Sequence, residues 1–244
     1  MKAIGIIPAR WGSTRFEGKV LADLCGKPVV QHVWESAKKA KTLDDLIVAA
    51  DDERIIRTVK EFGGKAIFTS PAQPSGTDRL AEAVNPLEVD IVVNIQGDEP
   101  LVQPIMIDNL VMALQNEKQA QMATMIKKIE KLEEIANPHV VKVVIDKNGY
   151  ALYFSRSVIP YHRADTEEPV KPLYYKHIGL YAFTKDFLFT FRNLPTSSLE
   201  KAEKLEQLRV LEFGYRIKTV ETKFDTVGID TPEDLEKVKA ILKG

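Results

Sequence analysis

A basic turn follows the first apolar run of the chain. In the stretch IIPARWGSTRFEGK three cations stand within ten positions: Arg10, Arg15 and Lys19. Gly12 and Gly18 separate them and allow backbone N–H groups to approach a ligand closely. Because arginine and lysine bond strongly to phosphate oxygens, the turn predicts a polyanion site, with several phosphates as the natural occupant.

The alternative for this turn is a solvated loop with scattered basic residues. The turn matches neither the dinucleotide fingerprint G-x-G-x-x-G nor the Walker A pattern, which disfavours both of those sites. It does follow the first strand-like run, and open parallel sheets bind ligands beyond the carboxyl ends of their strands. Position and charge density together favour a phosphate site.

Carboxylates suited to a metal ion stand far from the basic turn in sequence. Asp98 follows a strand-like run in VNIQGDEP. Magnesium on a nucleotide triphosphate is held by one or two carboxylates together with phosphates and water. A turn or cap aspartate is the alternative for Asp98. Glu99 is the weaker ligand candidate, because adjacent side chains of an extended segment point apart.

A second carboxylate is expected near the C-terminus, around GIDTPEDLE. The candidates there are Asp225, Asp230, Glu233 and Asp234. Thr231 and Pro232 form a natural N-cap and first helical position, with Asp234 three residues after the cap. Capping leaves Asp230 free to project toward the ligand edge of the sheet. We therefore expect Asp98 and Asp230 to form a metal pair for Mg²⁺.

The elements that must position these residues follow an alternating pattern. Continuously apolar runs at 2–8, 46–50, 65–69 and 90–96 predict strands covered on both faces, as in a parallel sheet. Helical patterns lie between them at 28–40 and 52–63. The order predicts an α/β fold with a doubly wound, mostly parallel sheet.

The second half of the chain changes character. Asn148-Gly149 separates two strand-like runs within 140–156, which predicts a β-hairpin. A further strand is expected at 174–184, after a long Pro-bearing loop at 159–174, and helices at 198–214 and 232–243. We expect a single domain over 1–244 with an antiparallel insertion around 139–184.

Composition narrows the class of function. The 244 residues carry 34 Lys and Arg against 35 Asp and Glu, so no overall basic field would attract nucleic acid. No apolar run approaches the roughly 20 residues that a membrane-spanning helix needs. The one cysteine, Cys25, cannot form an intrachain disulfide, which is typical of a reducing compartment. A cytoplasmic location is expected.

The chain as a whole resembles the nucleotide-sugar cytidylyltransferases, in particular those acting on 3-deoxy-manno-octulosonate (Kdo). The resemblance rests on the basic turn and on QPSGTDRLAEA, VNIQGDEP, NPHVVKVV, GYALYFSRSVIP, HIGLYAF, LEQLRVLEFG and GIDTPEDLE. It implies a nucleotide-diphospho-sugar transferase-like fold and transfer of CMP from CTP to Kdo, releasing pyrophosphate, for lipopolysaccharide precursor synthesis. Phe16-Glu17 replaces the Leu-Pro usual in the family, and we expect Glu17 to point outward.

The resemblance also implies roles for residues. For CTP it implies Pro8, Ala9, Arg10, Ser13, Arg15, Lys19, Ser75, Arg79 and Gln96. Of the residues above, Arg10, Lys19, Asp98 and Asp230 would be catalytic. Arg79 and the Pro8–Ala9 backbone would select cytosine. The alternative for the segment around Ser75 is a Ser-Gly turn followed by a helix cap at Thr77.

For the sugar acid, the resemblance implies a cation, amides, aromatic groups and an acid. These are Gln96, Arg156, His177, Tyr181, Glu206 and Gln207. Taken singly, each has a structural alternative as a strand end, a packing aromatic or a surface helix residue. The resemblance further implies a homodimer through the insertion, and the loop at 163–172 is expected to close over the sugar.

Rival functions remain open from the sequence alone. They are transfer to another sugar acid such as sialic acid, a non-catalytic sensor of sugar nucleotides, and a glycosyltransferase of similar architecture. Retention of both candidate metal carboxylates and of the whole basic turn argues against the sensor.

Overall fold

A computed structural model describes residues 1–13, 15–162 and 174–243. The elements, in chain order, are β1 (Ala3–Ala9), η1 (Lys19–Leu21), β2 (Asp23–Leu24), β3 (Lys27–Pro28), α1 (Val29–Ala37), β4 (Asp45–Ala50), α2 (Glu53–Glu61), β5 (Lys65–Phe68), α3 (Gly76–Val84), β6 (Ile91–Asn94), α4 (Pro104–Asn116), β7 (Met122–Lys128), α5 (Leu132–Ala136), β8 (Lys142–Ile145), β9 (Ala151–Ser155), β10 (Tyr175–Thr184), α6 (Lys185–Asn193), α7 (Ser198–Glu203), α8 (Gln207–Glu212), β11 (Ile217–Glu221) and α9 (Pro232–Lys243).

The apolar runs of the first half form neighbouring parallel strands, as the sequence predicts. The main sheet has the order β11-β7-β10-β6-β1-β4-β5, and β1 is parallel to both β4 and β6. All three of these strands are almost wholly buried, which explains their continuous apolar character. Their carboxyl ends therefore meet at one edge of the sheet.

One strand runs against this direction in the middle of the sheet. β10 lies antiparallel between β6 and β7, and its first part also pairs with β8. β8 and β9 form the predicted hairpin, in which Gly149 adopts the positive φ of 73° that the turn requires. The fold is thus a mixed, mostly parallel sheet with an antiparallel part, and the predicted fold class is confirmed.

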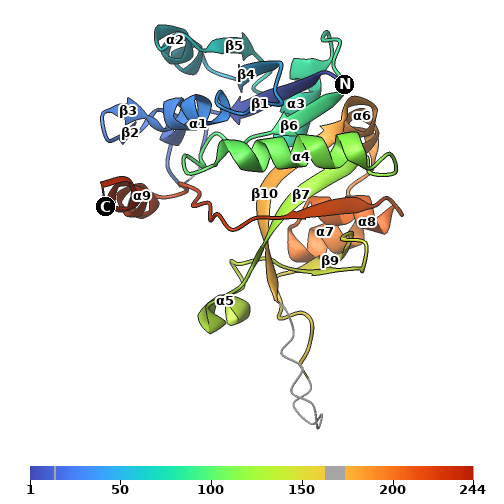
Figure 1. Cartoon of the computed structure of the whole chain (residues 1–244). Coiled ribbons are helices and arrows are strands. Elements are labelled where there is room, and N and C mark those ends of the chain that lie inside the picture. The colour runs from blue at the N-terminus through green and yellow to red at the C-terminus, as the bar shows by residue number, and fades with distance from the viewer. Residues whose placement is uncertain (14, 163–173, 244) are drawn as a thin grey trace.

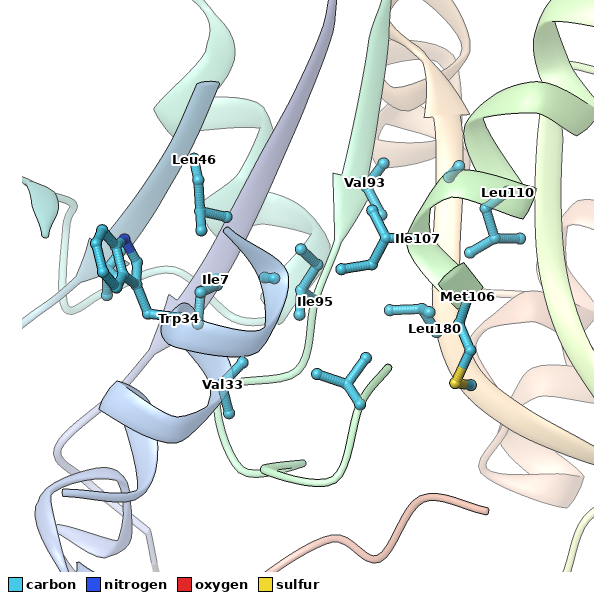
Figure 2. Close-up of a cluster of buried hydrophobic side chains, with 14 of the residues drawn as sticks. Ile7, Val33, Trp34, Leu46, Val93, Ile95, Met106, Ile107, Leu110 and Leu180 are labelled. Carbon is cyan, nitrogen blue, oxygen red and sulfur yellow. The ribbon is translucent and has the colours of Figure 1, made fainter. Parts of the chain in front are cut away.

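Helices cover both faces of the sheet (Figure 1). Helices α1, α2 and α4 pack on the face that carries Ile7, Val48 and Val93. Figure 2 shows part of this core, where Val33 and Trp34 of α1 and Met106 and Ile107 of α4 surround the strands. Helices α3, α6 and α8 pack on the other face. The layers hold the carboxyl edge rigidly.

The prediction of a single helix at 198–214 is wrong. It is divided into α7 and α8, because Lys204 adopts a left-handed conformation with φ 55° and ends α7. The break leaves Glu206 as the residue before α8. Most of the loop predicted at 159–174, and the closure expected at 163–172, lie outside the described residues.

The C-terminal helix returns the chain to the first turn. Ile229 is fully buried with Leu24, Val29, Leu235 and Val238. Thr231 caps α9 as predicted, since its hydroxyl accepts from the Asp234 amide at 3.3 Å and the Asp234 carboxylate accepts from the Thr231 amide at 3.2 Å. No helix among the described residues is both long and apolar enough to cross a membrane.

Candidate active site

A cavity of about 390 Å³ lies at the carboxyl edge of the sheet. β1, β4 and β6 all end there, so the residues that follow each strand come together. The cavity brings together most of the residues assigned to nucleotide and metal: Pro8, Arg10, Lys19, Ser75, Arg79, Gln96, Asp98 and Asp230.

Lys19 joins the two predicted metal carboxylates. Its ammonium lies 2.5 Å from Asp98 Oδ2 and 2.8 Å from Asp230 Oδ1. Arg15 pairs with the other oxygen of Asp230 at 2.9 Å. The cationic turn and the two distant acids therefore converge, as the sequence predicts.

The fold explains how Asp230 reaches Asp98 across 132 positions of sequence. The amide of Ile229 donates to the carbonyl of Asp98 at 2.9 Å, which fixes the chain next to the end of β6. Burial of Ile229 anchors the same segment, and the capping of α9 uses Thr231 and Asp234. The carboxylate of Asp230 is left to face Lys19.

The charges in this cluster stabilise one another. Burial alone would lower the pKa of Lys19, but Asp98 and Asp230 outweigh it and hold that pKa above its ordinary value. Burial would raise the pKa of Asp230, yet the bonds from Lys19 and Arg15 leave it below its usual range. Lys19 stays charged and Asp230 ionised at neutral pH.

The donor set fits Mg²⁺ carried by a nucleotide. Asp98 and Asp230 supply hard carboxylate oxygens that converge on a single ammonium, so they are close enough to share one ion. Within the described ranges, no group of three or more His, Cys, Asp or Glu side chains is placed to hold a metal ion. Two carboxylates suffice when phosphate and water complete the shell, which is the usual arrangement for magnesium.

A backbone hydrogen bond closes the basic turn. The Gly18 amide donates to the Trp11 carbonyl at 3.0 Å, and Gly18 has a φ of 67°. A Cβ at Gly18 would lie 2.8 Å from the Trp11 ring, so both space and conformation require glycine here. Glu17 is exposed, as expected, and accepts the Trp11 indole N–H at 2.7 Å.

A second, smaller cavity of about 140 Å³ adjoins the first, and the two share Gly76 and Gln96. Its apolar lining is Met122, Phe183 and Phe191, and its polar lining is Thr77, Asn94, Gln96, Tyr181, Glu206 and Gln207. Two buried atoms of these lining residues, Asn94 Oδ1 and Gln207 Nε2, have no hydrogen-bond partner among the residues that the structure describes. An unpaired acceptor and an unpaired donor suit a ligand rich in hydroxyl groups, since a hydroxyl can serve both.

Comparison with known proteins identifies the family of this chain. Residues 4–220 match the family model described as cytidylyltransferase. The 3-deoxy-manno-octulosonate cytidylyltransferases of Geotalea uraniireducens and Geotalea daltonii are 53% and 52% identical; each match covers the whole of this chain, with 100% and 99% of the respective relative. A solved CMP:2-keto-3-deoxy-manno-octonic acid synthetase complexed with CTP superposes with a TM-score of 0.94 at 44% identity, covering 100% of this chain and 99% of that one.

The chain belongs to the cytidylyltransferase family, among the 3-deoxy-manno-octulosonate cytidylyltransferases. The resemblance inferred from the sequence is thereby confirmed. The nucleotidyltransferase-like fold is confirmed by the same structural match.

In this cytidylyltransferase the antiparallel strand β10 brings one predicted residue, Tyr181, into the lining of the second cavity and a second, His177, to a place beside it. Its pairing with β7 is irregular between Ile178 and Tyr181, and Gln96 donates to the Gly179 carbonyl inside that irregularity at 3.2 Å. A bulge of this kind re-aims side chains near a site. Tyr181 lines the cavity, and His177 packs beside it with ring centroids 5.4 Å apart.

His177 is held as a neutral imidazole. Its Nε2 lies 3.0 Å from the Thr124 hydroxyl, and its ring meets Phe154 edge-on. Burial lowers the pKa of His177 to about 3. Burial also raises the pKa of Glu206, whose carboxylate accepts the Thr77 hydroxyl at 2.9 Å.

Not every predicted residue lines a cavity of the cytidylyltransferase. Arg156 donates to the carbonyls of Glu203 and Pro138, at 2.8 and 3.1 Å, outside both cavities. Ala9 is buried in β1, and Ser13 and Arg15 lie on the turn beside the first cavity. Their predicted contacts with substrate stay predictions.

Sequence reasoning also missed or misplaced some residues. The cap of α3 is Ser75, which accepts the Asp78 amide at 3.1 Å, so the alternative cap at Thr77 is wrong. The Thr77 hydroxyl instead binds Glu206. Asn94 and Asp51 were not singled out, although each stands at the carboxyl end of a buried strand, which was the available signal.

Proposed function

We propose that the chain transfers CMP from CTP to the anomeric hydroxyl of 3-deoxy-manno-octulosonate, releasing pyrophosphate. The observation that carries this proposal is the shared wall of the two cavities. A charged cavity suited to a triphosphate adjoins a smaller cavity whose polar lining can bind hydroxyl groups, and Gln96 and Gly76 line both. The relatives named for this reaction support the same substrates.

The basic turn would bind the leaving group. Arg10, Arg15 and Lys19 carry three positive charges to the β- and γ-phosphates and to the pyrophosphate that departs. Stabilising that charge in a preorganised site accelerates phosphoryl chemistry without a covalent intermediate. Lys19 already lies in the first cavity as a charged ammonium, where it would exchange carboxylate oxygens for phosphate oxygens.

Asp98 and Asp230 would hold Mg²⁺, and the reaction would depend on that ion. When bound, it supplies a Lewis acid that polarises the α-phosphate and lowers the pKa of the attacking hydroxyl. With a nucleotide present, Arg15 and Lys19 would turn from the carboxylates toward phosphate oxygens. The same residues would thus serve as mutual partners without substrate and as substrate ligands with it.

The second cavity would orient the acceptor. Glu206, Gln207 and Asn94 offer a carboxylate and two amides to sugar hydroxyls, against the flat surfaces of Tyr181 and Phe183. Holding the anomeric hydroxyl in line with the α-phosphorus turns a bimolecular reaction into an effectively unimolecular one. Arg79, in the wall of the first cavity, would contact the cytosine.

We also propose that the protein is a cytoplasmic homodimer that supplies lipopolysaccharide synthesis. The exposed apolar side chains Leu152, Val158 and Tyr161, in and after the edge strand β9, support a partner at the insertion around 139–184. Sedimentation equilibrium would test the dimer, with Leu152→Lys expected to yield monomers.

Pyrophosphate release tests the reaction. CTP or UTP would be supplied with Kdo, a sialic acid or no acceptor, each with and without Mg²⁺. We expect release with CTP, Kdo and Mg²⁺ together. Equal rates with sialic acid or UTP would assign the chain to a rival transfer, whereas CTP binding without any release would indicate a sensor.

A further inference from the structure

A buried carboxylate outside both cavities connects the two walls of the nucleotide site. Asp51 follows β4 and does not line either cavity. Its side chain is 12% exposed, and its two oxygens have different partners. Oδ1 accepts the backbone N–H of Trp11 at 2.9 Å, and Oδ2 accepts Arg79 Nη2 at 3.0 Å.

The Arg79 contact fixes one wall of the first cavity. Arg79 is 4% exposed and lines that cavity. Its other terminal nitrogen donates to Thr69 Oγ1 at 2.5 Å, and Thr69 in turn donates to the Ala50 carbonyl, next to Asp51. The end of β4 and the residue after β5 therefore hold the guanidinium in one orientation.

The Trp11 contact fixes the opposite wall. Trp11 follows Arg10, which lines the cavity, and its carbonyl accepts the Gly18 amide directly before Lys19. Through this one residue, Asp51 anchors both the start and the close of the basic turn. The segment is a loop, so the hydrogen bonds that tie it to the sheet help to determine where its cations lie.

We propose that Asp51 is a positioning residue for the nucleotide, which sets the orientation of Arg79 and the place of the basic turn at once. This inference rests on the proposed function and adds a residue that touches neither substrate. A buried arginine needs a paired charge to remain in place, and a backbone N–H needs only an acceptor. Asp51 supplies both.

A substitution at Asp51 can remove the charge of the side chain while keeping its size. Asp51→Asn retains the size and an acceptor for the Trp11 amide but removes the charge facing Arg79. Loss of a hydrogen bond between charged groups predicts a KM for CTP raised about tenfold to a hundredfold. The KM for Kdo should stay within about threefold, and the preference for CTP over UTP should fall, because Arg79 loses its fixed orientation.

Asp108→Asn is the matched control. Asp108 is also buried, and its Oδ1 accepts the amides of Lys41 and Thr42 at 2.8 Å, far from the cavities. Both variants should melt at lower temperature, but only Asp51→Asn should change the KM for CTP. If Asp51→Asn does not fold, Thr69→Val removes the other acceptor of Arg79 and should move the same two quantities in the same direction, by about threefold.

Calorimetric titration with CTP distinguishes failure of this inference from failure of the proposed function. If wild-type protein releases no pyrophosphate, the proposed function fails, and CTP affinity still tests Asp51. An Asp51→Asn variant that binds CTP and discriminates against UTP as wild type does would overturn the inference. A rise in both KM values that Asp108→Asn reproduces would overturn it equally.

Discussion

The two cavities differ in how their polar groups are satisfied. Around the first, charged lining groups and one behind them form ion pairs: Lys19 with Asp98 and Asp230, and Arg79 with Asp51, which lies outside the cavity. In the second, Asn94 Oδ1 and Gln207 Nε2 are buried and find no hydrogen-bond partner within 1–13, 15–162 and 174–243. Burying an unpaired charge costs far more free energy than burying an unpaired neutral amide. An amide can therefore stay without a partner until a ligand binds.

The difference suggests two ways of binding. A ligand of the first cavity must exchange existing ion pairs for its own, so binding there should be sensitive to charge. A ligand of the second cavity fills hydrogen bonds that nothing else makes, so binding there should be sensitive to the position of single hydroxyl groups.

The largest effect should follow a change in the charged cavity. Asp98→Asn removes one of the two carboxylates beside Lys19, and kcat should fall at least about a hundredfold, because a group that stabilises the transition state is lost. Asp225→Asn is the control, since Asp225 pairs with Lys127 and Lys176 on the surface and should leave kcat near wild type. Near-normal turnover in Asp98→Asn would contradict the metal assignment.

A change in the second cavity should act on the acceptor alone. Glu206→Gln keeps the shape of the side chain but removes its charge, and we expect the KM for Kdo to rise about tenfold while the KM for CTP stays unchanged. Glu236→Gln, on the exposed side of α9, should alter neither. An equal rise in both KM values would show that the cavities do not separate donor from acceptor.

Beside the second cavity, His177 should make stability depend on pH. Its pKa is about 3 in the folded chain against 6.5 ordinarily, so the unfolded chain binds a proton that the folded chain does not. Stability should therefore fall as pH drops below 6.5, by about 1.5 to 2 kcal/mol between pH 6.5 and pH 5.

Urea denaturation at pH 5 and pH 7.5 measures this dependence. His177→Gln should flatten it, and His139→Gln, at an exposed position, should not. An unchanged pH dependence in His177→Gln would mean that the imidazole is charged or solvated in the folded protein.

The smallest effect should come from the backbone of the basic turn. Gly18→Ala imposes a positive φ on alanine and places its Cβ against Trp11, and it should cost about 1 to 2 kcal/mol of stability. Gly12→Ala is the matched control, since no atom of the described residues, other than those of its chain neighbours, lies within 4 Å of the Cβ that alanine would add. Equal melting temperatures for the two variants would show that the turn can accommodate a Cβ at Gly18 despite the hydrogen bond between the Gly18 amide and the Trp11 carbonyl.

The sequence predicted the charged cavity better than the second one. Lys19, Asp98 and Asp230 were identifiable from their local sequence, because Lys19 belongs to the basic turn after β1, Asp98 follows β6, and Asp230 directly precedes the cap of α9. The strand order that unites them follows from the general rules for parallel sheets.

The second cavity is assembled from α3, β6, β7, β10, α6 and the start of α8, and no local sequence pattern specifies that these elements meet. The break at Lys204 was hidden, because the helical periodicity continues through it while the left-handed residue interrupts the backbone. Asp51 was hidden too, since its role depends on Trp11 and Arg79, which are distant in sequence. Packing between remote elements determines these features, so only the family resemblance pointed to Glu206 and Gln207.

A crystal structure of the protein with CTP and Mg²⁺ tests the central claim most directly. The account predicts the triphosphate between Arg10, Lys19, Asp98 and Asp230, with cytosine toward Arg79 and the α-phosphate facing the second cavity. Lys19 should have left at least one carboxylate for a phosphate oxygen. A nucleotide bound elsewhere, or one whose phosphates leave the pairs of Lys19 intact, would contradict it.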